Sequence, residues 1–86
     1  MHFKDINPAV RADVVAKRTG FYDACGQGIF CNLGQGAVDF PAVRALLDEA
    51  GFDGWCTVEQ DCDPTLDVDP KGDAIANRTY LSSIGF

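Results

Sequence analysis

Polar side chains that could bind a metal ion fall at two separate places in the sequence. His2, Lys4 and Asp5 stand in one short segment at the start, and Glu59 and Asp61 follow an apolar segment further along. Imidazole and carboxylate groups are ligands that suit Mn, Zn, Co or Fe. If both segments are strands that end at the same edge of a sheet, His2 and Glu59 can share one divalent ion. A catalytic metal needs further protein ligands, and His2 is the only histidine.

Each of these residues also has a purely structural explanation. A lone histidine beside the N-terminus is usually just solvated, and Glu59 can be a solvated strand end. Lys4 and Asp5 can form a surface ion pair, which contributes little to stability. The sequence alone leaves the catalytic and the structural explanations open.

A second candidate site is the glycine-rich stretch around Gln35. Gly34 and Gly36 could let the backbone approach a substrate or a phosphate closely, so Gly34, Gln35 and Gly36 are candidate substrate-binding residues. A turn before a helix explains the same pattern equally well. The acidic run at 61–69 lacks the glycine and the closing glutamate of an EF-hand calcium loop.

The elements that must position these groups alternate between strands and helices. The patterns predict a strand at 1–5, helices at 8–18 and 21–26, a loop at 27–38, a helix at 39–50, a strand at 55–58, a loop at 62–72 and a helix at 73–84. The helix at 39–50 carries an apolar stripe of Val43, Leu46, Leu47 and Ala50. This order indicates parallel α/β architecture. Because two strands do not make a stable parallel sheet, we expect partner strands from outside the chain.

Residues at the ends of these elements sharpen the boundaries. Gly20 is expected to end the first helix, and Asp39 and Gly51 to cap the start and the end of the third. Asp73 is placed near the N-cap of the last helix, with Gly85 after its end. The run at 55–58 is apolar or β-branched throughout, which is typical of a strand buried on both faces.

Composition excludes several classes of partner. The net charge is −6, and the seven basic residues are scattered, so we expect neither nucleic acid nor an anionic membrane as a partner. No apolar run approaches the length of a membrane span, and the N-terminus lacks the apolar core of a signal peptide. The four cysteines lack the paired spacing of a structural zinc site, and we expect reduced thiols in a cytoplasmic protein.

An ordered set of motifs carries a resemblance that spans essentially the whole chain. The motifs are His2-Phe3-Lys4-Asp5, the segments 33–40 and 51–55, Val58-Glu59-Gln60-Asp61-Cys62-Asp63-Pro64, and Ala76-Asn77-Arg78-Thr79-Tyr80-Leu81. Together they resemble the xylose-isomerase-like sugar phosphate isomerase/epimerase superfamily, and within it the inosose dehydratase branch of inositol catabolism. The resemblance implies a (β/α)₈ TIM barrel, of which residues 1–86 are the C-terminal part, the last two strand–helix units.

The resemblance also implies roles for individual residues. His2 and Glu59 match two metal ligands, and the remaining ligands, a Glu and an Asp, belong to preceding strands. The divalent metal would be Mn, Co or Mg. Lys4 and Glu59 are the candidate catalytic residues, with Lys4 stabilising an enediolate or the leaving oxygen. Pro8 stands where the epimerase branch has an arginine, and the insertion at 7–27 suits the dehydratase branch better.

Three functions remain open at this point. The first is a hydro-lyase that dehydrates inosose (2-keto-myo-inositol), and the second is an isomerase or epimerase of the same superfamily. Either would act on a small sugar or cyclitol ketone, as a monomer or a homo-oligomer, and we expect the isolated chain to be inactive without the missing N-terminal strands. The third is a small α/β binding protein without catalytic activity.

Overall fold

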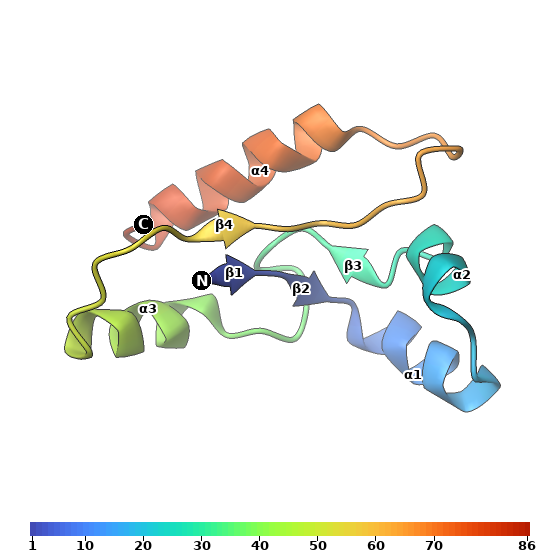
Figure 1. Cartoon of the computed structure of the whole chain (residues 1–86), viewed down its shortest axis with the longest axis horizontal. Helices are drawn as coiled ribbons and strands as arrows, with labels where there is room; N and C mark the ends of the chain where they lie inside the picture. The colour runs from blue at the N-terminus through green and yellow to red at the C-terminus, as the bar shows by residue number, and fades with distance from the viewer.

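The computed structural model describes all of residues 1–86 and has mixed α/β architecture (Figure 1). Its elements are, in order, β1 (His2–Phe3), β2 (Asp5–Ile6), α1 (Pro8–Lys17), α2 (Phe21–Gly26), β3 (Phe30–Cys31), α3 (Phe40–Glu49), β4 (Thr57–Val58) and α4 (Pro70–Ser83). The molecule is elongated, with principal extents of 40 × 27 × 18 Å. None of its helices has the length and apolar character needed to cross a lipid bilayer.

Two small sheets organise the chain. In the first, β1 and β4 pair in parallel, with His2 opposite Thr57 and Phe3 opposite Val58. This pairing confirms that the two strands bearing the candidate site run in the same direction. In the second, β2 and β3 pair antiparallel, with Asp5 opposite Cys31.

Strand β3 corrects the expectation of a continuous loop at 27–38. The strand holds only two residues, too few for any alternation to stand out. It exists because β2 lies beside it, and Asn7 N also donates a hydrogen bond to the carbonyl oxygen of Ile29 at 2.8 Å. A strand this short is specified by its partner and not by its own sequence.

The first helix begins where expected and ends earlier than expected. The side chain of Asn7 accepts hydrogen bonds from Ala9 N and Val10 N, and the helix begins at Pro8. It ends at Lys17, because Arg18, and not Gly20 as expected, takes the left-handed conformation (φ 52°) that ends the helix. Gly20 instead precedes α2 as its N-cap residue.

The ends of the two later helices give one confirmation and one correction. Asp39 accepts a hydrogen bond from Ala42 N at 3.0 Å, and Gly51 follows α3 with φ +65°, both as expected. Helix α4 begins at Pro70, one turn before the expected start. Its cap is Asp69, which accepts from Gly72 N at 3.0 Å, so Asp73 lies inside the first turn.

Two apolar clusters form the core, and the larger one packs against the parallel sheet through Phe3 and Val58. The larger one comprises Phe3, Leu33, Phe40 and Leu81, and the smaller one Val14, Ala24 and Ile29. The ring of Phe3 makes edge contacts with Phe40 and Phe86 at centroid distances of 5.4 and 5.2 Å. Phe3 thereby joins β1 to α3 and to the end of the chain.

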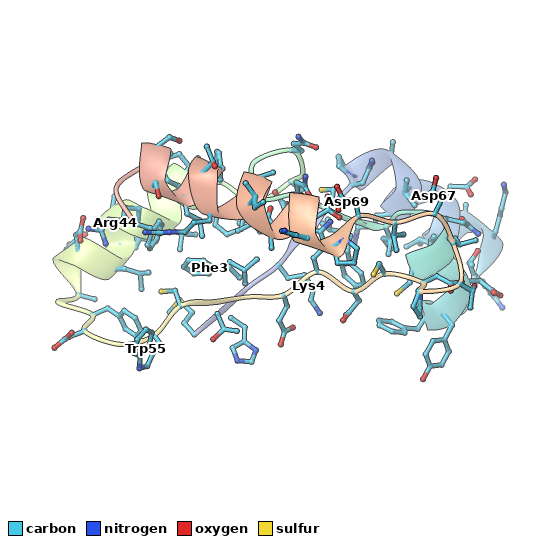
Figure 2. All side chains as sticks on the ribbon, turned by 90° about the horizontal axis from the view of Figure 1, so that it is seen from above. Phe3, Lys4, Arg44, Trp55, Asp67 and Asp69 are labelled. Carbon is cyan, nitrogen blue, oxygen red and sulfur yellow. The ribbon has the colours of Figure 1, made fainter.

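The other side of the parallel sheet is open, which corrects the expectation of a strand buried on both faces. Val58 packs against the larger cluster, whereas Thr57 is exposed and Trp55 is 90% exposed. The apolar stripe of α3 is likewise only partly covered, since Leu46 remains 64% exposed. Figure 2 shows Phe3 between α4 and β4, and it shows Lys4 and Trp55 on the side of β4 that faces away from α4.

Candidate functional site

The open face of the parallel sheet carries the charged residues. Successive side chains in a strand point to opposite faces, so His2 and Lys4 face away from Phe3, which is buried in the core. The parallel ladder continues past β4, because Glu59 N donates to the carbonyl oxygen of Phe3 at 2.8 Å. This bond brings Glu59 to the level of Lys4, on the open face at the C-terminal ends of both strands.

Both oxygens of the Glu59 carboxylate have a partner. Nδ1 of His2 lies 2.7 Å from Oε1 of Glu59, and Nζ of Lys4 lies 3.0 Å from Oε2. Nζ of Lys4 also donates to Oδ2 of Asp61 at 2.8 Å. The structure therefore brings His2, Lys4 and Glu59 together, as the sequence analysis expected, and adds Asp61 to the group. We call these four residues the charged cluster.

The contacts within the charged cluster shift two pKa values. The hydrogen bond and the positive charge of Lys4 hold the pKa of Glu59 below its usual value of 4.5. The hydrogen bonds to Asp61 and then to Glu59 raise the pKa of Lys4 above 10.5. At neutral pH, Glu59 is thus an anion suited to bind a cation, and Lys4 is an ammonium that cannot act as a base.

The charged cluster fits a divalent metal as half of a site. An imidazole nitrogen and a carboxylate oxygen already converge in His2 and Glu59. No group of three or more histidine, cysteine, aspartate or glutamate side chains in the chain is placed to hold a metal ion. The donors suit the metal that the resemblance implies, and a metal held here would need further ligands from outside these residues.

Asp5 is a structural residue, which corrects the expectation of a surface ion pair with Lys4. Its side chain is fully buried, and its carboxylate accepts four backbone hydrogen bonds. The donors are Ile6 N, Gly34 N, Gly36 N and Val38 N, at 2.9 to 3.1 Å. A carboxylate can accept about four hydrogen bonds, so the Asp5 side chain uses its full capacity to hold the backbone of the turn that precedes α3.

The same bonds decide what the two glycines do. The N–H groups of Gly34 and Gly36 both donate to Asp5, so they are not free to bind a substrate. Gly34 has φ +84°, and a Cβ atom there would collide with the ring of Tyr80. A Cβ atom on Gly36 would collide with the carboxylate of Asp5. The turn explanation therefore accounts for both glycines, and a substrate contact from Gln35 stays a prediction.

Asn77 is a buried polar residue that the sequence analysis did not single out. Its Oδ1 accepts from Leu33 N at 2.8 Å, and its Nδ2 donates to Oε1 of Gln60 at 2.9 Å. It joins α4 both to the turn before α3 and to the segment that follows β4. Because Gln60 lies between Glu59 and Asp61 in the sequence, Asn77 helps to fix the backbone that carries them.

Comparison with known proteins identifies relatives along almost the whole chain. No family model and no solved structure matches it. Proteins named inosose dehydratase from Yersinia enterocolitica and Serratia proteamaculans are each 40% identical to it over 81 residues, which is 94% of this chain. The protein of the same name from Geobacillus thermodenitrificans is 35% identical over the same length.

The chain resembles inosose dehydratases. It spans 27% of the length of these relatives, so about three quarters of an inosose dehydratase has no counterpart in it.

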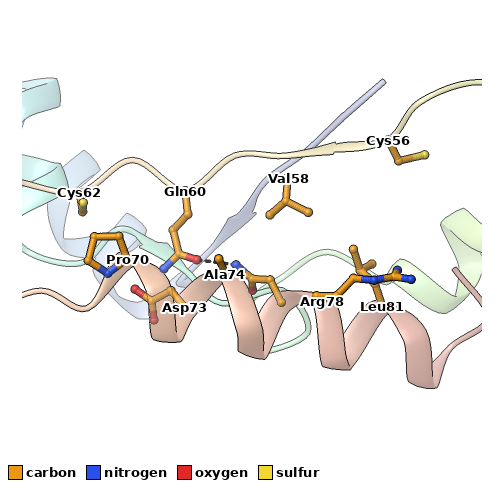
Figure 3. Close-up of a pocket in the computed structure, with 10 residues that line it drawn as sticks. Cys56, Val58, Gln60, Cys62, Pro70, Asp73, Ala74, Arg78 and Leu81 are labelled. Atoms are coloured by element: carbon orange, nitrogen blue, oxygen red, sulfur yellow. Dashed lines mark hydrogen bonds between the residues drawn. The ribbon is translucent and has the colours of Figure 1, made fainter.

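A groove on the other face of β4 is separate from the charged cluster. It has a volume of about 310 Å³ and lies between β4 and α4 (Figure 3). From the strand side it is lined by Cys56, Val58, Gln60 and Cys62, which alternate with Thr57, Glu59 and Asp61. β1 is the only strand paired with β4, so the other edge of β4 is open.

The thiols show no pairing in this fold. All four cysteines are free, and only Cys62 is exposed. Burial raises the pKa of Cys31, and it is also the main cause of the raised pKa of Cys25.

Proposed function

We propose that this chain forms one side of the active site of an inosose dehydratase, a divalent-metal-dependent lyase that removes water from 2-keto-myo-inositol. One observation carries the proposal: His2, Lys4 and Glu59 meet on the open face of two parallel strands, and Lys4 and Glu59 directly follow the C-terminal ends of these strands. In α/β barrels, this rim is where active sites are built. The similarity to inosose dehydratases over 94% of the chain supports the same assignment.

We further propose that residues 1–86 are the last two strand–helix units of a (β/α)₈ barrel. Helices α3 and α4 cover one face of the β1–β4 sheet and leave the charged face open, as the inward face of a barrel strand would be before closure. The open edge of β4 leaves room for a further strand. The relatives are several times longer than this chain, and their remaining length can supply the missing strands.

His2 and Glu59 would hold the metal together with ligands from outside this chain. When bound, a divalent ion polarises the ketone and so acidifies the adjacent C–H group. Glu59 suits this role because it is ionised at neutral pH and because His2 already touches one of its oxygens.

Lys4 would act as a fixed positive charge. A base from outside this chain removes the proton beside the ketone, and the electron pair left behind forms an enediolate. The electron pair then forms the new carbon–carbon double bond as the carbon–oxygen bond to the β-hydroxyl breaks, and the departing hydroxyl takes up the proton that the base removed and leaves as water. The Lys4 ammonium remains charged throughout, so it stabilises negative charge on the enediolate or on the departing oxygen without exchanging its own proton.

A chimera tests this proposal directly. In it, the chain replaces the 81 aligned residues of the Yersinia enterocolitica relative, which supplies the rest of the protein. With Mn²⁺ or Co²⁺ and 2-keto-myo-inositol, we expect the ultraviolet absorbance of an enedione product to grow. His2→Ala and Glu59→Gln should abolish this signal, while Glu49→Gln on the exposed face of α3 should preserve it.

Other outcomes of the same assay would contradict the proposal. Interconversion of ketoses without an enedione would assign the isomerase or epimerase function instead. A folded chimera that turns over neither kind of substrate would favour a binding protein without catalytic activity.

A further inference from the structure

We propose that Asp61 is a positioning residue for Lys4. Asp61 would hold the ammonium group of Lys4 in place when the carboxylate of Glu59 turns to a metal. The inference rests on the proposed function, and it adds a residue to which neither the resemblance nor the comparisons assign a role.

The ammonium group of Lys4 has three neighbours, two from the segment that follows β4 and one from β3. Oδ2 of Asp61 lies 2.8 Å away and Oε2 of Glu59 lies 3.0 Å away. The ring of Phe30, from β3, lies below it with its centroid 4.8 Å from Nζ. The Asp61 contact is the shorter of the two ion pairs.

Glu59 cannot be the main anchor of Lys4 in a metal-bound enzyme. One of its oxygens faces His2 and the other faces Lys4, so a cation held by His2 and Glu59 competes with Lys4 for the same carboxylate. A lysine side chain is a flexible four-carbon stem, and a single exposed ion pair does little to fix it. Without a second anchor, Lys4 would move toward solvent as the metal binds.

Asp61 supplies that second anchor independently of Glu59. It stands two residues further along the same extended segment, so its side chain reaches the open face beyond Glu59. Its hydrogen bond to Lys4 involves no atom of His2 or Glu59. Phe30 adds a cation–π contact below the ammonium, and the three contacts together form a network.

The consequence for catalysis is geometric. A fixed positive charge lowers the barrier only when it lies where negative charge develops, and a small displacement costs much of the effect. Asp61 would touch neither the substrate nor the metal, and would act only through Lys4.

Acetylation of the unaltered 86-residue chain tests the contact itself. Acetic anhydride is added at one fixed pH, and the rates at Lys4, Lys17 and Lys71 are compared by mass spectrometry. We expect Lys4 to react several-fold more slowly than Lys71, and Asp61→Asn to remove most of that protection. Asp13→Asn is the matched control, because it removes the exposed partner of Lys17, 2.9 Å away, and should leave Lys4 unchanged.

The acetylation rates can also overturn the inference. If Lys4 in the unaltered chain reacts as fast as Lys71, or if Asp61→Asn leaves its rate unchanged, Asp61 does not hold Lys4 and the inference is overturned.

The chimera tests the consequence. We expect Asp61→Asn to lower kcat on the order of 10- to 100-fold, as removal of a supporting hydrogen bond around a metal site does. KM and the calorimetric affinity for Mn²⁺ should stay unchanged, and Asp61→Glu should restore part of kcat. Weaker Mn²⁺ binding by Asp61→Asn would indicate that Asp61 is itself a metal ligand. An unchanged kcat would show that Asp61 does not affect catalysis. Either result overturns the inference. An inactive unaltered chimera would instead overturn the proposed function, while the acetylation rates still decide whether Asp61 holds Lys4.

Discussion

Nδ1 of His2 lies 2.7 Å from Oε1 of Glu59, although β1 opens the chain and β4 follows three helices later. The parallel pairing of β1 with β4 brings them together, because His2 lies opposite Thr57 and Glu59 is the next residue of that segment on the same face. The contact leaves both side chains partly exposed, so it contributes little to stability. Its importance lies in placing an imidazole and a carboxylate side by side, the two groups that we propose as metal ligands.

Asp5→Ala should destabilise the fold strongly. The substitution leaves four backbone N–H groups without their acceptor around a fully buried position. A buried donor left unpaired costs about 1–3 kcal/mol, so we expect a loss of at least 3 kcal/mol in the free energy of unfolding. Urea titration followed by circular dichroism measures it, with the exposed Asp67→Ala as the control. Equal stability of the two variants would contradict the structural role of Asp5.

Gly34→Ala should lower the stability of the fold more than Gly28→Ala does. Both glycines have positive φ, +84° and +77°, so both substitutions strain the backbone by about 1–3 kcal/mol. Only at Gly34 does the new Cβ atom also meet the ring of Tyr80, while nothing lies within 4 Å of a Cβ atom at Gly28. The difference between the two urea midpoints isolates the packing contribution. A larger loss for Gly28→Ala would show that the turn does not pack against α4 as described.

The carboxylate of Glu59 should titrate below the usual glutamate value of 4.5. Because the pKa is depressed in the fold, the cluster's contribution to stability is fully present above pH 4.5 and is lost as the pH falls through the lowered value. We expect Lys4→Met to raise the pKa of Glu59, since the hydrogen bond from Lys4 is the largest cause of the shift. The ¹³C chemical shift of the side-chain carboxyl measures it. A midpoint unchanged by Lys4→Met would rule out this cause.

Alkylation should distinguish the cysteines. Burial raises the pKa of Cys31 and Cys25, so less of each thiol is ionised at pH 8, and Cys31 is also half-buried. The thiolate is the nucleophile, so we expect Cys62, which is exposed, to react with iodoacetamide well before Cys31. Peptide mass spectrometry gives the rates, and the difference should disappear in urea. If Cys31 reacts first in the folded chain, the pairing of β2 with β3 is wrong.

The sequence by itself determined the local features of this protein. Asp39 and Gly51 mark the ends of α3, because caps depend on residues only a few positions away. The change from apolar to charged residues after Val58 marks the end of β4, and the motifs around Lys4 and Glu59 indicated the relatives that the comparisons found.

The tertiary structure decided what each polar residue does. Lys4 and Asp5 are neighbours in the sequence, yet Lys4 faces the open side and pairs with Glu59 and Asp61, while Asp5 is buried under the turn before α3. Strand β3, which places Phe30 below Lys4, likewise exists only through its pairing with β2. These outcomes depend on contacts between distant segments. The free energy of such contacts comes from burial and from shared hydrogen bonds, which no local pattern of residues encodes.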